Sequence, residues 1–241
     1  MYSPTQLTNK QKSELAFWDK EIRHYVEWLE GTLPNLYNTP SPRQSEMVAS
    51  DTQEHSAILT WLKQHQMPKY LADLQLQTDA FIGLNVLDVG AGPMPSAMAF
   101  HDCHITALDP LHPYYKILGF PYDTYYKMSG GTLDFATASA ENMPFEDASF
   151  DVVIAVNAID HVDGFEDTAK EIQRVLKPNG KLVMHIHCHP ATICEPVELT
   201  EERVITSFSS VKDLRIVHRS QQSYSSQGLP DTEHFTLCRN F

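Results

Sequence analysis

Cysteines, basic residues and long apolar runs are all scarce in this 241-residue sequence. The four cysteines, Cys103, Cys188, Cys194 and Cys238, have no CxxC spacing, which argues against a disulfide framework and against a structural zinc site. No segment approaches the roughly 20 apolar residues that span a bilayer, and the first residues lack the apolar core of a signal peptide. We therefore expect a cytoplasmic protein with reduced thiols.

Positive charge is outweighed by negative charge. The chain has 18 Lys and Arg residues against 31 Asp and Glu residues, which gives a formal net charge of -13. Nucleic acids and anionic membrane surfaces attract proteins through Lys and Arg, so neither is an expected partner. A neutral or cationic small molecule fits this balance, and we predict a small-molecule substrate; no sequence feature points to an oligomeric state.

The hydrophobic pattern changes near residue 80. Residues 1–80 carry apolar side chains at helical spacing between proline-rich turns, and Asp51 is predicted to begin a second helix that ends before Pro68. Residues 81–241 alternate short β-branched runs with helical stretches, which is typical of a doubly wound parallel sheet with helices on both faces. We expect a single α/β domain over residues 1–241, in which residues 1–80 form a helical lid on a Rossmann-like core.

A glycine-rich turn is the strongest motif. In Val86–Pro93 (VLDVGAGP) a buried strand ends at glycines that allow close approach of a ligand, and the turn is expected to open a helix. Asp109 ends the next strand about twenty residues on, where a carboxylate can bind ribose hydroxyls. Nicotinamide and flavin sites have a third glycine where this chain has Pro95. Asp88 would repel a pyrophosphate and attract a cation, which favours S-adenosylmethionine as the cofactor.

Three later segments complete a recognisable series. Ala138–Phe145, Phe150–Asn157 and Leu176–Gly180 follow the glycine turn in an order and spacing that resemble the class I S-adenosylmethionine-dependent methyltransferase family, in its small-molecule branch. The resemblance implies a seven-stranded, mostly parallel sheet with one antiparallel strand, and S-adenosylmethionine as the cofactor.

The same resemblance implies a set of cofactor-binding residues. They are Asp88, Gly90, Ala91, Gly92, Asp109, Pro110, Ser139, Ala140, Glu141 and Asn157. Ser139 departs from the family pattern, because many relatives carry an aspartate there that accepts a hydrogen bond from the adenine amino group. A serine hydroxyl accepts that bond without charge, so we expect a weaker or water-mediated adenine contact.

The acceptor is expected to meet the loops after the fourth and fifth strands, since ligands of open parallel sheets lie at the carboxyl ends of the strands. The Asn-Pro-Pro-Tyr signature of DNA and protein-amide methyltransferases is absent from the loop after the fourth strand. A hydroxyl acceptor benefits from a base that removes its proton. We predict His161 as that base, Asp160 as its orienting or alternate carboxylate, and His189 as a second candidate. A structural role for His161 is the alternative.

These features predict O-methylation of a hydroxyl group in a sugar or secondary metabolite. N-methylation of a small amine and a noncatalytic S-adenosylmethionine-binding role are the alternatives. His185, His187 and His189 alternate along the fifth strand and should project to one face, where polar side chains need partners. With Asp160 and His161 they outline a metal site, although we predict no bound metal.

Overall fold

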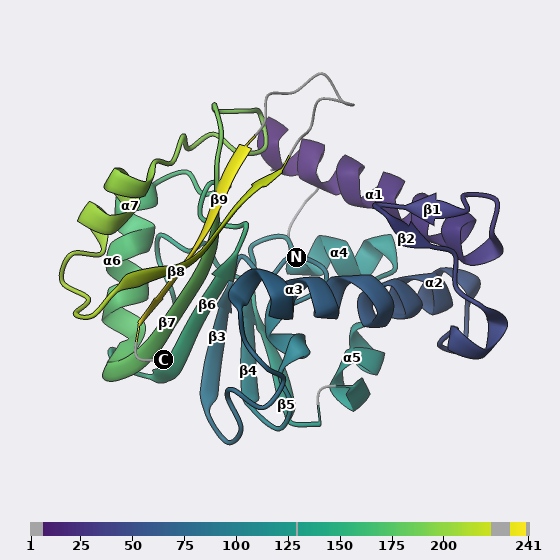
Figure 1. Ribbon diagram of the computed structural model, residues 1–241, viewed down its shortest axis with the longest axis horizontal. Helices are drawn as coiled ribbons and strands as arrows, with labels where there is room; N and C mark the ends of the chain where they lie inside the picture. The colour runs from purple at the N-terminus through teal and green to yellow at the C-terminus, as the bar shows by residue number, and fades with distance from the viewer. Residues whose placement is uncertain (1–6, 129, 223–231, 240–241) are drawn as a thin grey trace.

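The computed structural model describes residues 7–128, 130–222 and 232–239. One seven-stranded sheet has the order β5-β4-β3-β6-β7-β9-β8 (Figure 1). Its strands are β3 (Asn85–Val89), β4 (His104–Leu108), β5 (Thr132–Ala136), β6 (Phe150–Val156), β7 (Leu176–Cys188), β8 (Arg215–Gln222) and β9 (Thr232–Arg239). β9 pairs antiparallel with both β7 and β8, and the pairings among β3 to β7 are all parallel. The predicted seven-stranded, mostly parallel sheet is confirmed.

Helices cover both faces of this sheet, as predicted (Figure 1). On one face lie α6 (Phe165–Val175) and α7 (Glu201–Ser207), and on the other lie α4 (His112–Leu118), α5 (Tyr122–Met128) and the N-terminal helices. Successive strand residues point to opposite faces. Val86 accordingly packs in the core under the N-terminal helices, whereas Leu87 packs in the core under α6. Each face therefore has its own apolar core.

The N-terminal segment is helical, but its boundaries differ from the prediction. It contains α1 (Asn9–Glu30), a small hairpin of β1 (Asn35–Leu36) and β2 (Thr39–Pro40), a 3-10 turn η2 (Gln44–Glu46), α2 (Gln53–Trp61), a π-helical turn η3 (Leu62–Gln66) and α3 (Met67–Leu74). Thr52 caps α2 through its side chain, where Asp51 was expected. Pro68 does not end the helix, because it lies in the first turn of α3, where a missing N–H is tolerated.

The helix expected after the glycine turn is reduced to the 3-10 helix η4 (Ser96–Ala99). Pro93 and Pro95 remove backbone donors at this point, and the Tyr70 hydroxyl of α3 donates to the Met94 carbonyl at 2.9 Å. The hydrogen bond from Tyr70 thus fixes the end of the glycine turn against α3. No helix within the described ranges is both long and apolar enough to cross a membrane.

Candidate cofactor and acceptor site

The glycine turn after β3 has a backbone that only glycine adopts readily. Gly90 and Gly92 have φ angles of 64° and 59°, in the left-handed region. A Cβ atom at Gly90 would lie 2.5 Å from the Cβ of Ala158, which follows β6. The Gly92 N–H donates to Oδ2 of Asp109 at 2.9 Å. The turn is therefore fixed against the loops that follow β4 and β6.

Two buried carboxylates lie beside this turn. Asp88 accepts hydrogen bonds from the Ser96 hydroxyl at 2.9 Å and from the Ala97 N–H at 2.8 Å, and Asp109 accepts one from the Leu111 N–H at 2.8 Å. Burial raises the pKa of Asp88 to about 7 and that of Asp109 to about 6, although these hydrogen bonds act in the opposite direction. A cation bound nearby would favour the charged form of both carboxylates.

Asn157 lies at the carboxyl end of β6 with a left-handed φ of 49°. Its N–H donates to the His185 carbonyl at 2.9 Å. Its side-chain oxygen Oδ1 is buried and has no hydrogen-bond partner among the described residues. Burying an acceptor without a partner is costly, so this oxygen is positioned for a donor from a ligand.

The remaining predicted cofactor residues have varied surroundings. Ala91 and Ala140 are buried, while Pro110 and Ser139 are exposed. Glu141 accepts hydrogen bonds from the backbone N–H groups of Asp163 at 2.6 Å and Gly164 at 3.0 Å, at the start of α6. In this structure the Glu141 carboxylate therefore stabilises the end of a helix, and a cofactor contact for it stays a prediction.

Three carboxylates and two histidines meet at the ends of β6 and β7. Nδ1 of His161 lies 3.6 Å from Oε2 of Glu14, and its Nε2 lies 3.6 Å from Oε1 of Glu195. Nε2 of His189 lies 3.2 Å from Oδ2 of Asp160 and 3.6 Å from Oε2 of Glu195. All three predicted catalytic residues are thus in one cluster, which we call the edge cluster: Glu14, Asp160, His161, His189 and Glu195.

The carboxylates of the edge cluster raise the pKa of its two histidines. Burial opposes charge on His161, yet the neighbouring carboxylates Glu14, Asp160 and Glu195 raise its pKa to about 9. The hydrogen bond to Asp160 raises the pKa of His189 to about 9 despite partial burial. Both imidazoles are therefore protonated at neutral pH in this state. Both pKa values lie above the value of about 6.5 that an isolated histidine side chain shows.

Glu14 and Glu195 were not among the predicted site residues. Glu195 lies in the loop after β7, so the rule that parallel strands present ligands at their carboxyl ends could have indicated it. Glu14 lies on α1, and only the packing of α1 against the sheet brings it close to His161. Oxygen and nitrogen atoms of Asp160, His189 and Glu195 lie within 4.8 Å of one another, which is compatible with a metal as well as with a shared proton.

The first half of α1 lies against the loop after β6. The Lys10 ammonium donates to the His161 carbonyl at 2.8 Å and forms an ion pair with Asp163. The Trp18 indole donates to Glu14 at 2.7 Å and packs edge-on against Phe120. The charges of Glu14 and His161 also affect the pKa of Asp109. The edge cluster and the glycine turn therefore adjoin, with α1 beside both.

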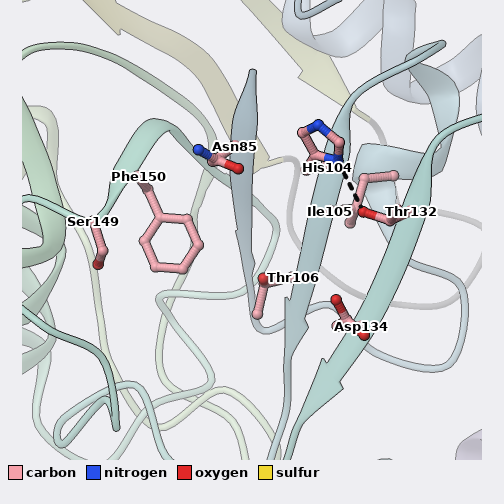
Figure 2. Close-up of a pocket in the computed structure, with 8 residues that line it drawn as sticks. All are labelled: Asn85, His104, Ile105, Thr106, Thr132, Asp134, Ser149 and Phe150. Atoms are coloured by element: carbon pink, nitrogen blue, oxygen red, sulfur yellow. Dashed lines mark hydrogen bonds between the residues drawn. The ribbon is translucent and has the colours of Figure 1, made fainter. Parts of the chain in front are cut away.

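An open hollow of about 400 Å³ lies at the opposite end of the strands, where they begin (Figure 2). It is lined by Asn85, His104, Ile105, Thr106, Thr132, Asp134, Ser149 and Phe150. Several of these residues begin β3, β4, β5 and β6, whereas ligands of parallel sheets bind where the strands end. The hollow is therefore separate from the glycine turn and the edge cluster, and we assign it no part in the chemistry.

The residues at the glycine turn fit the cofactor that the fold family uses. A sulfonium and an ammonium group would offset the two buried carboxylates, Asp88 and Asp109, and hydrogen-bond donors would satisfy the buried oxygen of Asn157. A Cβ at Gly90 would collide with Ala158, so a glycine is needed here for the turn to pack against the loop after β6.

Comparison with known proteins finds relatives that include two curated methyltransferases and a solved structure. The O-methyltransferase rstn1 of Aspergillus nomiae is 33% identical over 105 residues, which are 42% of this chain and 46% of that protein. Cycloartenol-C-24-methyltransferase 1 of Oryza sativa is 31% identical over 161 residues, 64% of this chain and 46% of that protein. This chain thus matches about half the length of these relatives.

One of these likenesses is to a solved structure. The 1,6-didemethyltoxoflavin-N1-methyltransferase of Burkholderia thailandensis, solved with S-adenosylhomocysteine, superposes with a TM-score of 0.51 at 17% identity, covering 81% of this chain and 94% of that one. At that identity the likeness establishes the fold alone. Residues 87–184 match the methyltransferase domain family, and this match contains all ten predicted cofactor residues and the predicted residues Asp160 and His161. Over residues 87–184 this chain is similar to the methyltransferase domain family, in which S-adenosylmethionine is the methyl donor.

Proposed function

We propose that the protein transfers a methyl group from S-adenosylmethionine to a hydroxyl group of a small molecule. The observation that supports this most is the edge cluster, which brings His161 and Asp160 next to the glycine turn. The cofactor, when bound, supplies an electrophilic methyl group on sulfur. Positioning can drive most of such a displacement, and a base adds to it when the acceptor is a hydroxyl.

The chain's own residues divide this work. Asp88, Asp109 and the glycine turn would hold the cofactor, and Asn157 would accept one of its hydrogen bonds. In the transfer the acceptor oxygen forms a bond to the methyl carbon while the carbon–sulfur bond breaks and its electron pair stays on sulfur. The hydroxyl proton passes to Nε2 of His161, which must first have lost its own proton. Because the pKa of His161 is about 9, the rate should rise with pH up to about 9.

N-methylation of a small amine is the second candidate. The three carboxylates of the edge cluster, Glu14, Asp160 and Glu195, would attract a cationic amine. An amine nitrogen can attack without prior loss of a proton to a base, so this reaction depends less on His161. The names of the relatives include both an O-methyltransferase and a sterol-type C-methyltransferase, so a test panel should contain alcohols, phenols, sterols and amines.

The substrate and location stay part of this proposal. The formal net charge of -13 supports a small-molecule acceptor over a nucleic acid, and the cytoplasmic location stays a prediction. The segment of residues 1–80 is proposed as a lid, because α1 contacts the loop after β6 through Lys10 and Glu14.

Replacement of His161 tests the proposed chemistry. Release of S-adenosylhomocysteine is measured across the panel for the wild type, for His161→Ala and for the exposed control His101→Ala. We expect His161→Ala to lower turnover of a hydroxyl acceptor by about 10²–10⁴-fold, the usual contribution of a general base, while cofactor affinity stays nearly constant. Full activity of His161→Ala on hydroxyl acceptors would show that positioning alone suffices. Cofactor binding without turnover of any compound would support a noncatalytic role.

A further inference from the structure

A second group of histidines lies outside the edge cluster, on the pairing between β7 and β9. In this antiparallel register His187 is opposite His234, and His185 is opposite Thr236. One ring nitrogen from each of the three histidines lies within 4.8 Å of the other two. His185 and His234 are only 2% and 4% exposed, and His187 is half-buried. His189 was expected on the same face, but it follows the end of β7 and joins the edge cluster.

The hydrogen bonds around His185 determine its tautomer. The Thr236 hydroxyl donates its single proton to the Asp73 carbonyl of α3. The same hydroxyl oxygen lies 3.1 Å from Nδ1 of His185, so it can only accept there, and Nδ1 must carry the proton. Nε2 of His185 therefore presents a lone pair. This arrangement, with the outer nitrogen bonded to a fixed acceptor, is the one that orients metal-binding histidines.

Two ring nitrogens of this group, on His185 and His187, lack a partner among the described residues. Nε2 of His185 and Nε2 of His187 are buried and lack hydrogen-bond partners within the described part of the chain. Burial lowers the pKa of His185 and of His187, and it lowers that of His234 to about 4. Neighbouring imidazoles and Lys69 act in the same direction, whereas Asp73 opposes the shift at His185 and His234. Burial thus favours the neutral imidazole, which is the form that binds a metal ion.

We propose that His185, His187 and His234 bind a single divalent transition-metal ion, with zinc as the occupant. Three neutral imidazoles are a common zinc ligand set, and they leave a fourth position open. Zinc–nitrogen bonds of about 2.0–2.1 Å place tetrahedral nitrogens about 3.4 Å apart, so the rings need to close by no more than about 1.4 Å. The ion would satisfy both unpartnered nitrogens and would join β7 to β9.

The edge cluster offers a weaker alternative for the same ion. Its histidine nitrogens already face carboxylates, and a proton satisfies His189 between Asp160 and Glu195. Around the three histidines the nearby charged pair is Lys69 with Asp73, whose ammonium and carboxylate already bind each other. The unprotonated imidazole nitrogens of His185 and His187 can therefore be satisfied by a bound metal cation. Softer nitrogen donors also select zinc over the oxygen-seeking ions magnesium and calcium.

Metal titration of the full chain tests the proposal. The purified protein is stripped with a chelator and titrated with Zn²⁺, and bound metal is counted by elemental mass spectrometry. Co²⁺ serves as a second probe because its visible absorption reports nitrogen ligation and geometry. We expect one equivalent of metal and a raised melting temperature. His187→Gln and His234→Gln should weaken binding by more than about 100-fold, and Thr236→Val by about 10–100-fold, the usual effect of losing an outer hydrogen-bond partner.

The control variants distinguish metal binding by these three histidines from surface binding, from loss of folding and from binding at the edge cluster. His101→Gln, an exposed histidine, should bind metal like the wild type, and melting of each metal-free variant shows whether it folds. Thr236→Val preserves all three imidazoles, so weaker binding by a folded variant supports the tautomer argument directly. Unchanged binding in folded His187→Gln and His234→Gln would overturn the proposal. Loss of the metal in His189→Gln alone would also overturn it, because the ion would then belong to the edge cluster.

Discussion

Replacement of Glu14 by glutamine removes one carboxylate from His161 and keeps the shape of the side chain. Glutamine retains an oxygen that accepts from the Trp18 indole, so the main loss is the charge 3.6 Å from Nδ1 of His161. Asp160 and Glu195 remain on the other sides of the ring. The pKa of His161 should therefore fall but stay above that of an isolated histidine.

The size of the effect follows from the folded-state pKa. Raising a histidine pKa from 6.5 to about 9 corresponds to about 3 kcal/mol of preference for the imidazolium, of which Glu14 supplies roughly 1–2 kcal/mol. Because the folded value lies above the unfolded one, this stabilisation is complete below pH 6.5 and disappears as the pH rises through about 9. The loss of stability in Glu14→Gln should accordingly be about 1–2 kcal/mol at pH 6 and near zero above pH 10.

Urea unfolding at pH 6, 8 and 10 measures this difference, and NMR titration of the His161 ring follows its pKa directly. Glu27→Gln is the matched control, because Glu27 is an exposed glutamate on the same helix. In the activity assay the pH at which turnover rises should shift downward in Glu14→Gln. A stability difference that is the same at all three pH values, with an unchanged His161 titration, would refute the argument that Glu14 sustains the charge on His161.

Three further outcomes follow from the described geometry. Gly90→Ala should lower the free energy of unfolding in urea by about 2–4 kcal/mol, because the new Cβ collides with Ala158 and the left-handed φ is unfavourable for alanine. Gly92→Ala has the same unfavourable φ but open space around the new Cβ, so it should cost only about 1–2 kcal/mol. Burial raises the pKa of Asp88 and Asp109, the two carboxylates beside the glycine turn, to about 7 and 6, so calorimetry should show affinity for S-adenosylmethionine rising roughly 10- to 100-fold between pH 5 and 7.5. The affinity for S-adenosylhomocysteine, whose sulfur is uncharged, should rise less over the same range. An equal rise in affinity for the two compounds would contradict this reasoning. If the N-terminal segment is a lid, bound S-adenosylhomocysteine should slow limited proteolysis within residues 38–50, and equal cleavage rates would exclude ordering on binding.

The sheet was predictable because each strand carries its own local signal. The run from Val86 to Pro93 specifies a buried strand and a turn, and Asp109 marks the end of the next strand. The position of His161 and Asp160 at the carboxyl ends of the strands followed from topology alone, and their catalytic role stays a prediction. The helix after the turn was overestimated, because two prolines within three residues favour a short 3-10 helix over a regular one.

Contacts between distant segments were not predictable. Nothing near Glu14 in the sequence indicates that α1 brings it to His161, and the raised pKa of His161 depends on that contact. The same holds for the three-histidine group, since His234 meets His187 only through the register of β7 with β9. Alternation along one strand could show that His185 and His187 share a face, but the third ring comes from a strand that is late in the sequence.

The position of β9 also affects how the protein can fold while it is being synthesised. β8 leaves the ribosome before β9, yet it pairs with β9, and β9 in turn pairs with the edge of β7. Until residues 223–239 have emerged, β7 has an open edge and β8 has no neighbour in the sheet. Before β9 has formed these pairings, a chaperone or a second nascent chain can pair with the exposed edge of β7.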